Sequence, residues 1–171
     1  MTSKDLPLIP DFSRQHFNLG ELLNRVENPD GQWTDLPIRP GIYLVLWPIG
    51  KPLRIREEAG EPGRILAQRW IEITERSPTD ILYIGKGDSL RNRVRQLVRF
   101  GCGRATNHRG GEDLWWIEGI GDAGVLIQTC PDDKQTGFEN EALERFFRGH
   151  GNYPLANSQG PRGPERWWPD S

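Results

Sequence analysis

The sequence is poor in the residues that build metal clusters and disulfide frameworks. Its 171 residues include only two cysteines, Cys102 and Cys130, and three histidines. The cysteines have neither the short spacing of metal ligands nor the number that a disulfide framework requires. The sequence therefore predicts neither a cysteine-ligated metal nor a disulfide-stabilised fold.

Long apolar runs are also absent. No run approaches the roughly 18 residues that a membrane helix needs, and no signal peptide opens the chain. We therefore expect a cytoplasmic protein that has no membrane partner. A chain of 171 residues is long enough to bury a core, and residues 1–171 are expected to form a single domain.

The net charge is small, but positive charge is concentrated in one segment. The formal net charge of the chain is −2, whereas residues 81–110 carry seven Lys/Arg against the single acid Asp88, a net of +6. The remaining residues therefore carry −8. A local basic segment on an acidic chain is typical of a site for a polyanion. A solvated surface with no ligand is the alternative reading.

Hydrophobic periodicity predicts an α/β (α+β) protein. A glycine-containing turn is expected after residues 81–84, with Asp88 or Ser89 capping the next helix. Strands are predicted at residues 41–47, 81–84 and 125–130, with one further short strand at 52–56. Helices are predicted at residues 17–26, 64–76, 90–100, 112–118 and 136–148.

Two charged residues occupy unusual positions on these helices. Arg93 points into the apolar arc of helix 90–100, where a guanidinium is costly unless it has a partner. One explanation is that Arg93 forms a buried ion pair or extends its side chain out to solvent. The other is that it provides a cationic site for a phosphate. On the last helix, Thr136 and Glu139 form a predicted capping box, and Glu144 lies just beyond the apolar face, as either a site carboxylate or an ordinary boundary residue.

Five short motifs follow one another along the chain. They are Gly41-Ile-Tyr43, Tyr83-Ile-Gly85, Arg93 ten residues after Tyr83, Leu143-Glu144, and Pro154-Leu-Ala-Asn157. Together they resemble the GIY-YIG nuclease family. The resemblance implies a sandwich with a central three-stranded antiparallel sheet flanked by helices. It divides the chain into an N-terminal extension (1–40), a catalytic core (41–157) with an insertion (48–80), and a C-terminal tail (158–171).

The resemblance also implies a metal-dependent endonuclease that hydrolyses DNA by a single-metal mechanism, leaving 5′-phosphate and 3′-hydroxyl ends. Glu144 would hold Mg²⁺ or Mn²⁺, which prefer oxygen ligands. Tyr43 would act as the general base or orient the water, Tyr83 would contact the phosphate or the water, and Arg93 would stabilise the charge on phosphorus. Asn157 would tie the last loop to the catalytic helix.

The other basic residues would bind the nucleic-acid backbone without reading its sequence. These predicted contacts are Lys86, Arg91, Arg95, Arg99 and, in a glycine-rich loop, His108. DNA is the expected partner, single- or double-stranded. RNA, a structure-specific nickase, or an inactive nucleic-acid- or protein-binding module on the same fold are the alternatives. The oligomeric state is not predicted.

Overall fold

The computed structural model describes residues 1–6, 8–28, 30–106 and 110–157. Four strands form one antiparallel sheet, in the spatial order β1-β4-β2-β3. The strands are β1 (Arg14–Asn18), β2 (Gly41–Leu46), β3 (Ile81–Gly87) and β4 (Gly124–Thr129). The α-helices are α1 (Leu19–Glu27), α2 (Gly60–Arg76), α3 (Leu90–Gly101) and α4 (Gln135–His150). Short 3₁₀ helices are η1 (Ser3–Asp5), η2 (Glu57–Ala59), η3 (Glu112–Trp116) and η4 (Ile120–Asp122).

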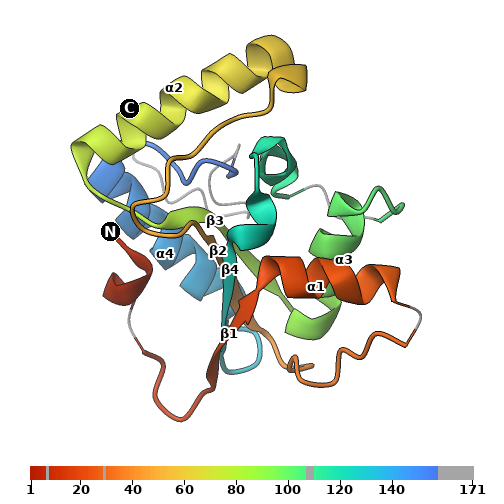
Figure 1. Cartoon of the computed structure of the whole chain (residues 1–171). Coiled ribbons are helices and arrows are strands. Elements are labelled where there is room, and N and C mark those ends of the chain that lie inside the picture. The colour runs from red at the N-terminus through yellow and green to blue at the C-terminus, as the bar shows by residue number, and fades with distance from the viewer. Residues whose placement is uncertain (7, 29, 107–109, 158–171) are drawn as a thin grey trace.

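The sheet separates two apolar clusters, because successive side chains of a strand point to opposite faces. On β2, Tyr43 and Val45 belong to the cluster that α1 and α3 cover. Ile42 and Leu44 belong to the other cluster, which α4 covers. Figure 1 shows α1 and α3 side by side on one side of the sheet and α4 on the other.

Helix α2 lies at one end of this arrangement (Figure 1). It contributes Leu66 to the first cluster and Ile73 to the second, so it contacts both layers. It lies within the predicted insertion 48–80. The expected short strand at 52–56 is reduced to a single bridge between Ile55 and Ile117.

The α+β prediction is confirmed at the level of an antiparallel sheet with flanking helices, but the sheet has four strands rather than three. The additional strand, β1, pairs with β4 at the edge of the sheet. It takes up Phe17 and Asn18, which were predicted to begin a helix. Asn18 still caps α1, because its side chain accepts from the Glu21 amide.

Strand β3 is longer than predicted and includes the residues expected to form a turn. Gly85, Lys86 and Gly87 continue the ladder with β2. Ser89 then caps α3 by accepting from the Asn92 amide, at a distance of 3.4 Å. None of the helices in the described part of the chain combines the length and apolar character that a membrane crossing requires.

Candidate functional site

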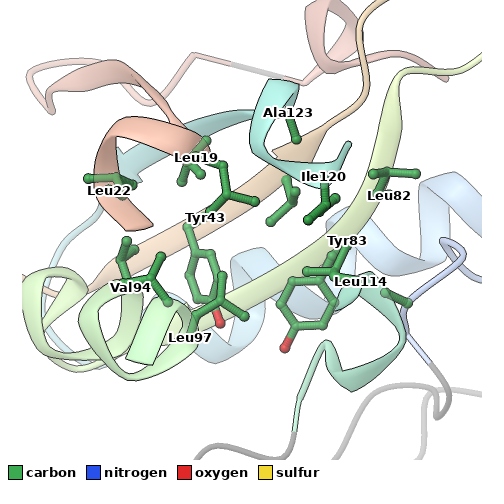
Figure 2. Packing of buried hydrophobic residues seen from close by; sticks show 14 of the residues in the cluster. Leu19, Leu22, Tyr43, Leu82, Tyr83, Val94, Leu97, Leu114, Ile120 and Ala123 are labelled. Atoms are coloured by element: carbon green, nitrogen blue, oxygen red, sulfur yellow. The ribbon is translucent and has the colours of Figure 1, made fainter. Parts of the chain in front are cut away.

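The pairing of β2 with β3 brings Tyr43 and Tyr83 to the same face of the sheet. Tyr43 lies opposite Gly85 in the ladder, and Val45 lies opposite Tyr83. The two ring centroids are 5.7 Å apart, at an interplanar angle of 51°. Figure 2 shows both hydroxyl groups pointing in the same direction, away from α1. The two predicted site tyrosines therefore form one cluster.

Gly85 is what allows this arrangement. A Cβ on Gly85 would lie 2.5 Å from Cζ of Tyr43 and 2.7 Å from its hydroxyl oxygen. Real atoms do not approach this closely, so any side chain at position 85 would displace the ring. The second tripeptide motif thus has a packing explanation: its glycine leaves room for the tyrosine of the first.

Arg93 lies beside this cluster, on α3. A Cβ on Gly87 would lie 2.7 Å from Cβ of Arg93. The arginine side chain therefore packs against β3 at a glycine, where the strand has no side chain. The guanidinium is half-buried, and its Nη1 donates to Gln96 Oε1 at 3.2 Å. Its positive charge acts on the Tyr43 hydroxyl, lowering the pKa of that group.

Burial nevertheless dominates the ionisation of Tyr43. Its side chain is fully buried, and burial raises the pKa of the hydroxyl well above the ordinary value of 10. The Tyr83 hydroxyl and Glu139 raise it further, against the opposing effect of Arg93. Tyr43 is therefore neutral at physiological pH. That state disfavours the predicted role as a general base and suits a hydrogen-bond donor.

We expect Tyr43→Phe to reduce the loss of stability at alkaline pH. In the unfolded chain tyrosine ionises near pH 10, whereas folded Tyr43 keeps its proton. Below pH 10 the tyrosine is protonated in both states, so its ionisation does not reduce stability. Above pH 10 only the unfolded chain loses the proton, and the free energy of unfolding falls by up to about 1.4 kcal/mol per pH unit. Urea unfolding between pH 8 and 11 should give a shallower decline for the variant. Equal declines would mean that Tyr43 ionises normally.

Lys86 points to the opposite face of β3, toward α4. Its ammonium donates to Thr136 Oγ1 at 3.0 Å and lies 3.2 Å from a carboxylate oxygen of Glu139. The predicted capping box is therefore wrong: α4 begins at Gln135 after Lys134, with no side-chain cap, and Thr136 and Glu139 face Lys86 instead. Glu139 is a site residue that the sequence reasoning missed, because it had been assigned to the helix start.

Glu144 lies elsewhere on α4. Its carboxylate accepts from Arg148, one helical turn further on, and about a third of its side chain is exposed. Glu139, whose side chain is 14% exposed, is instead the α4 carboxylate that acts on Tyr43. The structure therefore brings Tyr43, Tyr83 and Arg93 together, and Glu139 is the α4 carboxylate whose charge raises the pKa of Tyr43.

The predicted backbone contacts on α3 have different surroundings. Arg91 donates to the carbonyls of Leu36 and Thr34, so it fixes the loop before β2. Arg95 is exposed and Arg99 is half-exposed. His108, the remaining predicted contact, lies outside the described residues, as does the predicted tail 158–171.

Asn157 is buried against the outer edge of β3. Its Oδ1 accepts from the Ile84 amide at 2.9 Å, and its Nδ2 donates to the Ile84 carbonyl at 2.8 Å. The last loop is thus tied to the strand that carries the site, rather than to the helix named in the prediction. The same contact satisfies backbone groups that an edge strand otherwise leaves open.

The metal prediction rests on few ligands. Among the described residues, no three His, Cys, Asp or Glu side chains come together to hold a metal ion. Glu144 is engaged by Arg148. These residues do not make a protein-only metal site, and no reaction step through a metal follows from them.

Comparison with known proteins gives one curated relative. The chain is 29% identical, over 159 aligned positions, to the probable dihydroorotate dehydrogenase B (NAD(+)), electron transfer subunit, of Methanothermobacter thermautotrophicus. The alignment covers 72% of this chain and 58% of the relative, so the chain spans little more than half of that protein's length. No protein-family model matches the chain. No solved structure gives a significant match.

These findings correct the family and the activity predicted from the motifs. The relative is an electron transfer subunit, and no nuclease family matches. The predictions of a GIY-YIG nuclease, of a metal-dependent endonuclease and of its nuclease and nickase variants are therefore wrong. The physical reason lies in the two tripeptide motifs, which are short. Packing explains them without a nuclease site, because the tyrosine of one strand lies over the glycine of the strand paired with it.

Proposed function

We propose that this chain binds a phosphate-bearing nucleotide ligand beside Tyr83 and Arg93, as the ligand-binding part of a redox assembly. The observation that carries the proposal is that Arg93 lies beside Tyr43 and Tyr83, with the Tyr43 ring packed over Gly85 and the Arg93 stem over Gly87. Together these residues offer a cation and hydroxyl groups at one place on the sheet.

The hydroxyl groups suit a phosphate ligand. A hydrogen bond with Tyr83 raises the pKa of Tyr43, so the two hydroxyls act as one hydrogen-bonded pair. Phosphate oxygens are acceptors, and a planar guanidinium matches their geometry. Tyr83 and Arg93 are the groups that would contact the ligand, and Tyr43 would orient Tyr83.

The relative supports the choice of a nucleotide as the ligand. Its name refers to NAD(+), a ligand that carries two phosphates, and to electron transfer. We therefore assign the chain a ligand-binding role within such an electron-transfer assembly.

A divalent cation is a further part of the proposal. Mg²⁺ is commonly held by one or two carboxylates together with the phosphates of a ligand. Glu139 is the carboxylate whose charge raises the pKa of Tyr43, and it would exchange its ion pair with Lys86 for such a cation once a phosphate is bound. Adding Mg²⁺ to the titrations described next tests this: tighter ligand binding that Glu139→Gln abolishes is the expected result.

Arg93→Ala should weaken binding of NAD⁺ by about 10- to 100-fold, the effect of losing a hydrogen bond to a charged group. Isothermal titration of the full chain measures it. Arg95→Ala is the matched control, because Arg95 is exposed on the same helix and makes no described contact with the tyrosines. Equal affinities of wild type and Arg93→Ala, or no binding by the wild type, would reject the proposal.

The same titration with a single-stranded and a double-stranded DNA oligonucleotide, and with RNA, tests the nucleic-acid partner predicted from the basic segment. That partner stays a prediction, and it shares its phosphate chemistry with a nucleotide. Binding of oligonucleotide that exceeds binding of NAD⁺, lost in Arg93→Ala and steeply weakened by salt, would replace the nucleotide as the assigned ligand.

A further inference from the structure

The predicted insertion contains an arginine that touches the loop behind the site. Arg69 lies on α2, and its Nη2 donates to the carbonyl oxygens of Pro154 at 3.1 Å and Asn157 at 3.0 Å. The guanidinium is partly buried, so its hydrogen bonds are shielded from water and hold their geometry more firmly than surface contacts. One side chain of α2 thus fixes both ends of the last turn of this loop.

The loop held by Arg69 runs along the outer edge of β3. The Ala156 amide donates to the Leu82 carbonyl at 2.9 Å, and the Asn157 side chain makes its two bonds to Ile84. Leu82 and Ile84 flank Tyr83. Ile84 also precedes Gly85, which lies against the Tyr43 ring. A shift of the loop would therefore move the backbone on both sides of Tyr83.

A second element links Arg69 to the same place. Arg69 and Asp113, on η3, act on each other electrostatically, and each counters the effect of burial on the pKa of the other. Gly111 lies directly before η3, and a Cβ there would lie 3.3 Å from Leu97 and 3.6 Å from the Tyr83 ring. Arg69 thus lies where α2, η3 and the last loop meet behind Tyr83.

We propose that Arg69 is a positioning residue for the ligand site, acting from α2 through Asn157 on strand β3. The inference rests on the proposed ligand site. It gives the segment 48–80 the role of positioning strand β3, which differs both from contacting the ligand and from filling the core. Arg69 holds the loop, the loop holds the β3 edge, and the edge fixes the direction of the Tyr83 hydroxyl.

A double-mutant cycle tests the route of action. Arg69→Ala is expected to weaken NAD⁺ binding about 5- to 10-fold, and to speed hydrogen exchange of the Ile84 amide at least tenfold. In an Asn157→Ala background the same change should have almost no further effect on either quantity. Effects of Arg69→Ala that multiply fully with those of Asn157→Ala would overturn the proposal, because independent damage to the fold is additive in free energy.

Arg64→Ala is the matched control, since Arg64 lies on the same helix, its side chain is 81% exposed, and it forms an ion pair with Glu61 of the same helix. It should leave both readouts unchanged. The exchange measurement keeps the two proposals separate. If wild type does not bind NAD⁺, the ligand assignment fails, but unchanged Ile84 exchange in Arg69→Ala is what would overturn the role of Arg69.

Discussion

Replacing Asn157 with alanine is expected to lower the free energy of unfolding by about 2 to 6 kcal/mol. The side chain is buried and makes both of its bonds to the backbone of Ile84. Its removal leaves a buried N–H and a buried C=O without partners, and each such group costs about 1 to 3 kcal/mol. Urea-induced unfolding followed by circular dichroism measures the change.

Asn140→Ala is the matched control for this prediction. Asn140 is a partly buried asparagine on α4 whose Oδ1 has no hydrogen-bond partner among the described residues. Deleting an unsatisfied oxygen removes a cost rather than a bond, so this variant should change stability by less than about 1 kcal/mol. Similar losses in the free energy of unfolding for the two variants would show that the hydrogen bonds of Asn157 to β3 do not stabilise the fold.

The sequence predicts the strands that carry strong apolar patterns, but not the one that lacks them. Residues 41–46, 81–84 and 125–129 are rich in branched and aromatic side chains, and the structure has strands there. β1, with the sequence Arg-Gln-His-Phe-Asn, buries no side chain completely. An edge strand of this kind is held by its backbone ladder to β4, and the ladder leaves no periodic signal in the side chains.

Glycines misled the prediction around the site for a related reason. Gly85 and Gly87 are typical of a turn when only neighbouring residues are considered. In the fold they belong to β3, because the Tyr43 ring and the Arg93 stem occupy the space where their side chains would be. Such a close approach is a tertiary property. It involves strand pairing between residues some forty positions apart.

The choice between two glutamates shows the limit of helical periodicity. Glu139 was predicted to form a capping box with Thr136, whereas Glu144 was the candidate for the site because it lies just past the apolar face and in the Leu143-Glu144 motif. In the structure Thr136 and Glu139 contact Lys86, which lies on a different element, strand β3. A local pattern cannot specify that contact.

Phe146→Ala is expected to lower the free energy of unfolding by about 3 to 5 kcal/mol, the usual cost of removing a buried phenylalanine. Phe146 is fully buried in the cluster between the sheet and α4, and its ring is stacked on His150 with centroids 4.2 Å apart. Phe147→Ala is the control. Its ring is only partly buried and contacts Tyr153, so a loss well below that of Phe146→Ala is expected.

The position of Phe146 makes a second result measurable in the same variant. Phe146 belongs to the cluster on the α4 side of the sheet, whereas Tyr43 and Tyr83 belong to the cluster on the opposite face. Below the unfolding transition, Phe146→Ala should therefore bind NAD⁺ within about twofold of wild type, although it unfolds at lower urea. A large loss of affinity in the folded variant would mean that the α4 layer shapes the site across the sheet, and that stability and ligand binding are not carried by separate faces.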